Sequence, residues 1–243
     1  MTPQRPRPAF YALRSGGWRD YVTLLHPPYT LWHLSYVAVG AALAPRLDWA
    51  VLGWTTLAFA LAMGVGAHAL DELRGRPLQT RIPERTLLVL AIVSIAAASA
   101  IGITVAVSRT LWLLVFVAAG AFIVVAYNLE LFGGKLHGGL WFPAAWGAFP
   151  VLTAYFASAR TLHAEAFAAA AYAFATSWAQ RRLSTPVRLV RRRVVAVEGA
   201  MELDDGSRVP LDRDALAGPA EASLKALAAG VVLIAVALLL ARS

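Results

Sequence analysis

The chain contains no cysteine, so it can form neither a disulfide nor a thiolate metal site. Charge is also scarce, because 15% of the 243 residues are charged, whereas about a quarter are charged in soluble domains. Acidic side chains are the scarcer kind, with 14 Asp and Glu against 22 Lys and Arg. These shortages exclude a disulfide-stapled domain and argue against a soluble enzyme.

Long apolar runs make up most of the chain. Hydrophobic residues are 59% of the total and the mean hydropathy is +0.61. A membrane-spanning helix needs about 20 predominantly apolar residues, so the pattern predicts an all-α, polytopic membrane helical bundle. Seven segments are predicted to span the membrane: 29–44, 49–70, 86–107, 110–127, 141–157, 163–180 and 222–241.

The basic residues indicate how these segments are oriented. If the N-terminus is cytoplasmic, 18 of the 22 Lys and Arg lie inside: four before residue 29, four in 71–85, one in 128–140 and nine in 181–225. Lys and Arg collect in cytoplasmic loops. We therefore predict an integral protein of the cell membrane with a cytoplasmic N-terminus and an external C-terminus. This topology accounts for the net charge of +8, and no nucleic-acid partner is expected without a soluble basic domain.

Four stretches organise the chain. Residues 1–28 are predicted to form a cytoplasmic N-terminal segment, and residues 29–180 a transmembrane helical bundle. Residues 181–221 are predicted to form a basic cytoplasmic loop, and residues 222–241 the last membrane span. Within the loop, residues 194–212 alternate in polarity around Asp205 and Gly206, which predicts a small β-hairpin turning at that pair. An isolated hairpin is marginal in water, so we expect it to pack against the membrane domain.

The most unusual stretch is GVGAHALDELRGRPLQTRI, residues 64–82, where the second apolar segment runs into a basic loop. His68 and Glu72 are four residues apart and Asp71 is three after His68, so a helix places them on similar faces. Ionisable residues at membrane depth are costly and suggest a function. Carboxylate oxygens are ligands that Mg²⁺ prefers, and these acids therefore indicate a metal site.

Basic residues follow these acids at once. Arg74 and Arg76 flank Gly75, and guanidinium groups bind phosphate oxygens through paired hydrogen bonds. Acids for a metal beside arginines for a phosphate indicate a diphosphate ligand. The alternative is structural: Asp71 and Glu72 pair with Arg74 and Arg76 at a solvated helix end.

A second polar cluster follows the fourth apolar segment. Tyr127 and Asn128 end that segment, and Lys135 and His137 lie in the glycine-rich loop after it. The predicted topology puts this loop on the same cytoplasmic side as the first cluster. The alternative interpretation is a flexible turn in which Asn128 caps the helix.

Together these stretches resemble the UbiA superfamily of intramembrane prenyltransferases, which are helical bundles with two cytoplasmic Asp-rich motifs. AHALDELRGRPLQTRI resembles a shortened first motif, N-D-x-x-D-x-x-x-D followed by R-P-L. Asp71 falls on the second Asp, and residues 76–78 match R-P-L. Ala67, His68 and Gly75 stand where the motif has its Asn and its other two Asp residues.

Two further stretches carry the resemblance. Residues 126–156, AYNLELFGGKLHGGLWFPAAWGAFPVLTAYF, are similar to the family's Y-S-x-P-P-x-x-L-K-x-x-G-x-G-E segment and the helix after it. Residues 183–189, LSTPVRL, are similar to T-L-P-V-R-L. The second Asp-rich motif is absent, because residues 177–182 contain no acid. The family's bundle usually has nine spans, against the seven predicted here.

The resemblance implies transfer of a prenyl group from a prenyl diphosphate to a lipophilic acceptor in the bilayer, with Mg²⁺ at the diphosphate. Asp71 and Glu72 would be catalytic and would hold the metal with His68. The residues that would bind the diphosphate are Arg74, Arg76, Lys135, Arg188, Tyr127 and Asn128. Two other functions fit the sequence: a non-catalytic protein of this fold that binds an isoprenoid lipid or a partner, and an unrelated transporter or assembly factor.

Overall fold

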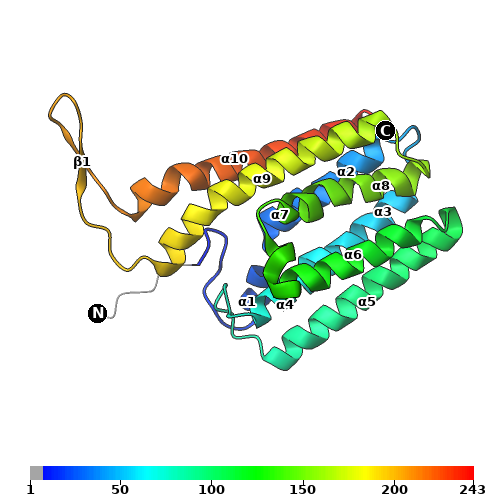
Figure 1. The fold of residues 1–243 in the computed structure, drawn as a ribbon, viewed down its shortest axis with the longest axis horizontal. Helices are drawn as coiled ribbons and strands as arrows, with labels where there is room; N and C mark the ends of the chain where they lie inside the picture. Colours follow the sequence, from blue (N-terminus) through cyan, green and yellow to red (C-terminus); the bar gives the residue numbers. More distant parts are fainter. Residues whose placement is uncertain (1–7) are drawn as a thin grey trace.

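The computed structural model describes residues 8–243, and 74% of it is helical. The helices lie roughly side by side along the long axis of the molecule (Figure 1). The elements are α1 (Trp18–Leu24), α2 (Pro27–Leu43), α3 (Trp49–Phe59), η1 (Ala60–Ala67), α4 (His68–Leu73), α5 (Glu84–Arg109), α6 (Leu113–Asn128), η2 (Phe132–His137), α7 (Trp141–Pro143), η3 (Ala144–Ala148), α8 (Phe149–Ala159), α9 (Ala164–Arg193), β1 (Ala200–Glu202), β2 (Arg208–Pro210) and α10 (Arg213–Leu240). The predicted helical class is therefore confirmed.

Three helical runs in the described part of the chain are long and apolar enough to cross a membrane. They are Trp49–Leu73, which joins α3, η1 and α4, Glu84–Arg109, and Arg213–Leu240, with 25, 26 and 28 residues. Helix α6 is apolar but shorter. Each of the seven predicted segments lies, apart from a few end residues, within one helix or one unbroken helical run. These apolar helices support a membrane protein.

The helices pack in two groups that meet at α2 and α8. Helices α2, α8, α9 and α10 share one apolar core, and η1, α4, α5, α6 and η3 share another. Two glycines bring backbones into direct contact. A Cβ on Gly40 of α2 would lie 2.3 Å from the Val151 carbonyl oxygen. A Cβ on Gly147 of η3 would lie 2.4 Å from the Ala173 carbonyl oxygen. Close packing through small residues is common between membrane helices.

Two helical runs widen into π-helix turns. η1 interrupts the run from α3 to α4, and η3 interrupts the run from α7 to α8. Each contains one large side chain that is almost fully buried, Met63 in η1 and Trp146 in η3. Such π turns within α-helices occur often at functional sites.

The stretch predicted as the basic loop, 181–221, differs from the expectation in three ways, the first being that residues 213–221 already belong to helix α10. Residues 181–193 continue helix α9 without a break, with Pro186 inside it. The hairpin is present, with β1 and β2 antiparallel and the turn at Asp205 and Gly206. It projects from the end of the bundle (Figure 1), and all of its strand residues are exposed. The expectation that it packs against the membrane domain is wrong, because every residue of both strands is exposed.

Candidate functional site

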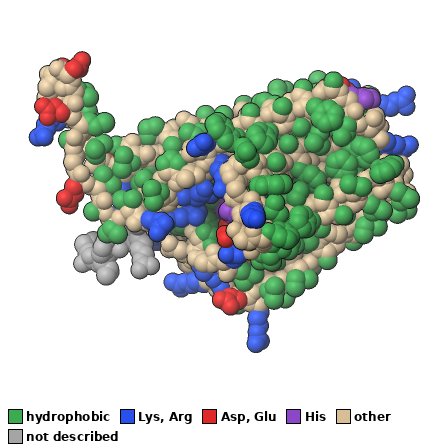
Figure 2. Space-filling model, viewed as in Figure 1, with side chains coloured by type: hydrophobic (Ala, Val, Ile, Leu, Met, Phe, Trp, Pro, Cys, Tyr) green, Lys and Arg blue, Asp and Glu red, His purple; other side chains and the backbone are tan. Residues whose placement is uncertain are grey.

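A cavity of about 500 Å³, called here the polar pocket, opens at the end of the bundle where α4 ends and α9 continues. Its walls come from the N-terminal segment, α2, α4, α6, η2, α7, η3 and α9. Figure 2 shows basic side chains around a hollow on this part of the surface, while hydrophobic side chains cover most of the bundle. The polar side chains that line the pocket are Tyr11, His26, Tyr29, His33, His68, Asp71, Tyr127, Asn128, His137, Gln180, Arg181, Ser184, Arg188, Arg192 and Arg193.

One wall is formed by arginines of α9 and is called here the arginine wall: Arg181, Arg188 and Arg192. Their spacings of seven and four residues place them on one face of the helix. Arg181 donates to the Tyr127 hydroxyl at 3.0 Å and to the His137 carbonyl at 3.2 Å. Its guanidinium is therefore fixed deep in the pocket, while Arg188 remains exposed at the mouth.

A neighbouring arginine on another face of α9 holds this wall in place. Arg191 makes two hydrogen bonds to the Glu221 carboxylate of α10, at 2.9 and 2.8 Å, and lies 3.3 Å from an Asp214 oxygen. The bonds to Glu221 raise the pKa of Arg191 above its ordinary value. A bidentate pair of this kind fixes orientation as well as energy, so the pair ties the basic end of α9 to α10.

The structure separates the two predicted catalytic acids. Asp71 lines the polar pocket, and among the described residues its carboxylate has no hydrogen-bond or ion-pair partner. Glu72 is 1% exposed, and its oxygens accept from Leu78 N, Thr80 N and the Thr80 hydroxyl at 2.8–2.9 Å. Glu72 therefore closes the loop after α4 and does not face the pocket.

The predicted basic ligands divide in the same way. Arg74 pairs with Glu130 at 3.1 Å, Arg76 donates to the Thr80 and Ile82 carbonyls, and Lys135 is exposed in η2. None of these three lines the pocket. The predicted residues that the structure does bring together there are His68, Asp71, Tyr127, Asn128 and Arg188. The structural alternative is not found either, because neither acid pairs with Arg74 or Arg76.

Imidazoles form a second wall, opposite in character to the arginines. The Nδ1 atoms of His33, His68 and His137 lie 2.7, 3.1 and 3.1 Å from the carbonyl oxygens of Trp146, Gly64 and Tyr127. A carbonyl only accepts, so each Nδ1 carries the proton. In the neutral ring each Nε2 then has a free lone pair, and this wall accepts hydrogen bonds rather than donating them.

His26 joins this wall from the turn before α2. Its ring stacks on His68 with centroids 4.1 Å apart, and its Nδ1 lies 2.9 Å from the Tyr11 hydroxyl. Its backbone is left-handed, at φ 46°, and its buried Nε2 has no partner among the described residues. Burial lowers the pKa of His26 well below its ordinary value, so the ring is neutral. Strained backbone often marks a functional site.

The donors in the polar pocket do not fit the metal cluster that the resemblance implies. No group of three or more His, Asp or Glu side chains within residues 8–243 could hold a metal ion. Residues 1–7, MTPQRPR, contain none of these types and cannot add one. A hard divalent cation takes six or more ligands, most of them oxygens, whereas this pocket offers one free carboxylate, on Asp71.

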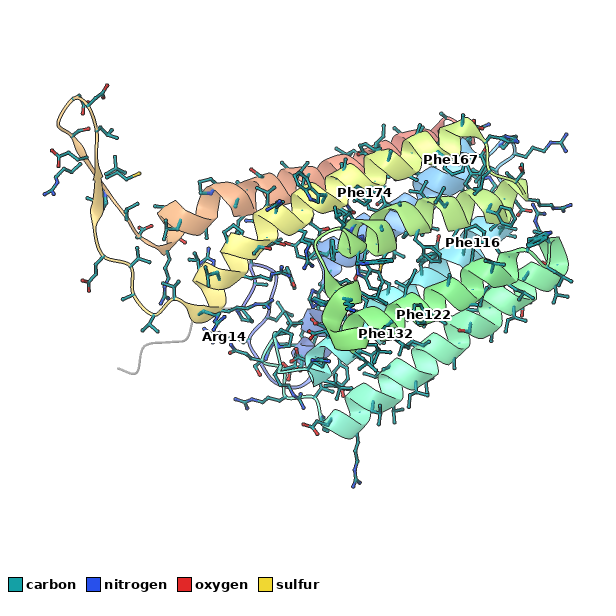
Figure 3. All side chains as sticks on the ribbon, viewed as in Figure 1. Arg14, Phe116, Phe122, Phe132, Phe167 and Phe174 are labelled. Carbon is teal, nitrogen blue, oxygen red and sulfur yellow. The ribbon has the colours of Figure 1, made fainter. Side chains whose placement is uncertain are left out.

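A second cavity, called here the apolar pocket, lies among α3, α5, α6, η3 and α8, with a volume of about 100 Å³. Its lining is almost wholly apolar and includes Phe116, which Figure 3 labels between α6 and α8 and which stacks on Phe156 at 5.0 Å. Met63 and Trp146 line both pockets. The polar pocket and the apolar pocket therefore border the same two π-helix turns.

Sequence reasoning missed several residues of the polar pocket. Arg181 and Arg192 are not among the predicted ligands, because the sequence predicts a loop over residues 181–193. The signal was present, since Arg181, Arg188 and Arg192 share one face once the run is treated as helix. Tyr11 and His26 gave no comparable signal, because they enter the pocket through turns.

Comparison of the chain with models of known protein families, with curated proteins and with solved structures found no match.

Proposed function

We propose that this protein is an integral membrane prenyltransferase, a divergent member of the UbiA type. It binds a prenyl diphosphate and transfers the prenyl group to a lipophilic acceptor in the bilayer. One observation carries the proposal: the arginine-lined polar pocket and the apolar pocket lie next to each other, with Met63 and Trp146 in the lining of both. A ligand with an anionic head and an apolar chain would place its head in the polar pocket and the start of its chain toward the apolar pocket.

The proposed topology has seven spans in the cell membrane, with the N-terminus cytoplasmic and the C-terminus external. Arg109 lies 3.1 Å from Asp48, and Arg242 donates to the Ala44 carbonyl at 3.0 Å. These contacts gather arginines of the predicted external loops at one end of the bundle. The arginine wall lies at the other end, because α2 runs from the pocket residue His26 toward Ala44. Such asymmetry is expected when the pocket faces the cytoplasm.

The proposed reaction places the charge of the leaving group on the arginine wall. The bond between C1 of the prenyl chain and the diphosphate oxygen breaks, and the electron pair leaves with the diphosphate. A new bond forms between C1 and the acceptor, whose proton passes to the Asp71 carboxylate. Fixed guanidinium groups stabilise developing negative charge, and the apolar pocket keeps water from the allylic centre.

The second candidate is a non-catalytic protein that binds an isoprenoid lipid in the same pockets. The observation that favours it is the orientation of Glu72, which leaves Asp71 as the one carboxylate of the predicted acidic pair that faces the polar pocket. Binding would then need the arginine wall but no proton acceptor.

The deciding experiment follows the release of diphosphate from geranylgeranyl diphosphate by the purified protein in a membrane lipid extract. We expect release in the wild-type protein and loss of it in Asp71→Asn, while geranylgeranyl diphosphate still raises the melting temperature of the variant. Glu130→Gln, which removes an exposed acid outside the pocket, is the matched control. Ligand stabilisation without release in any variant would select the non-catalytic candidate.

A further inference from the structure

The polar pocket carries a marked excess of positive charge. Arg181, Arg188, Arg192 and Arg193 line it, against one acid, Asp71. A diphosphate head is strongly anionic, and Mg²⁺ commonly neutralises such groups in proteins. Here the protein itself supplies the opposite charge.

Several other acids near this end of the molecule are already engaged. Glu72 is bound by the loop after α4, Glu130 by Arg74, and Glu221 by Arg191. Asp20 accepts from the backbone nitrogens of Gly16 and Arg81. The acids of the hairpin lie on the projecting strands and their turn (Figure 1). None of these carboxylates lines the polar pocket.

The guanidinium groups at the mouth are largely unengaged. Arg192 uses its Nε, at 3.2 Å from the Pro8 carbonyl, and Arg188 makes one long contact of 3.4 Å with Thr185. Their remaining N–H groups have no other protein acceptor among the described residues. Arg188 and Arg192 are four residues apart on one helix face, and both side chains line the polar pocket.

We infer that the arginine wall itself binds the diphosphate head, in the place that a magnesium cluster would otherwise take, so that binding needs no divalent cation. This inference rests on the proposed function and specifies how its substrate is held. Paired N–H donors from arginine match phosphate oxygens bidentately, and Arg181, fixed by Tyr127 and His137, marks the inner limit of the head group.

The test measures the affinity of geranylgeranyl diphosphate for the detergent-solubilised protein, once in EDTA and once in Mg²⁺. We expect the same dissociation constant in both. Arg188→Gln and Arg192→Gln should each weaken binding about tenfold or more, since hydrogen bonds to charged groups are lost. Arg188→Lys should fall in between, because it keeps the charge without the fork.

The matched control is Arg182→Gln, which changes an arginine of the same helix that stacks on Trp178 at 5.0 Å and does not line the pocket. It should bind as the wild type does. Binding that appears only with Mg²⁺ would overturn the inference and leave the proposed function standing. Equal losses in Arg182→Gln and Arg188→Gln would also overturn it. Absence of binding in both buffers would remove the proposed function itself.

Discussion

Asp71 and Glu72 are neighbours in the chain with opposite surroundings. Consecutive helical residues point about 100° apart, so one carboxylate reaches the polar pocket and the other reaches the loop after α4. The Asp71 carboxylate has no protein partner among the described residues, whereas Glu72 accepts three hydrogen bonds from Leu78 and Thr80. The first acid is available to a ligand and the second serves the fold.

We expect Glu72→Ala to destabilise the protein by about 2–4 kcal/mol, because it leaves buried N–H groups of Leu78 and Thr80 without an acceptor. Asp71→Ala should leave the stability of the ligand-free protein nearly unchanged. Thermal unfolding of both variants in the same detergent measures the difference. A larger loss in Asp71→Ala than in Glu72→Ala would contradict the roles assigned here.

At the scale of elements, the apolar pattern was enough to predict the helices, and the polarity alternation around Asp205 was enough to predict the hairpin. The pattern does not reveal the π turns at Met63 and Trp146, because they arise from packing between helices distant in sequence. The pattern also does not predict that residues 181–193 are helical, since polar residues after an apolar run do not show whether the helix continues.

The candidate site was predictable in part for the same reason. Asp71 and Tyr127 end apolar segments, so their chemistry stands out in the sequence. The direction of Glu72 depends on how the next eight residues fold back onto it, and no local pattern encodes that return. Arg188 is indicated by the family resemblance. Arg181 and Arg192 can be placed on the same face as Arg188 only when residues 181–193 are known to be helical.

The contact between α2 and α8 depends on Gly40, whose Cα lies against the Val151 backbone. We expect Gly40→Ala to cost about 1–3 kcal/mol, as overpacking commonly does, because the new Cβ would lie 2.3 Å from a carbonyl oxygen. Gly53→Ala on α3 is the matched control, since its Cβ would meet nothing within 4 Å. Thermal unfolding would refute the packing argument if both variants melted alike.

For the whole molecule, the absence of cysteine makes the orientation directly measurable. Ser207→Cys places a thiol in the exposed hairpin turn, and Ser243→Cys places one at the opposite end of α10. With a cytoplasmic N-terminus, a membrane-impermeant maleimide applied to intact cells should label Ser243→Cys and should not label Ser207→Cys. Labelling of Ser207→Cys alone would mean the inverted topology, and labelling of both would contradict the spanning arrangement.

The polar pocket joins parts of the chain that are made at very different times. Arg192 of α9 contacts the Pro8 carbonyl across 184 residues of sequence, and Arg191 is bound by Glu221 of α10, the helix that follows α9. During synthesis the N-terminal parts of a chain fold first, so the early helices enter the bilayer before the arginine wall exists. The polar pocket is therefore complete only after α9 has been made, and a chain truncated before α9 lacks the arginine wall.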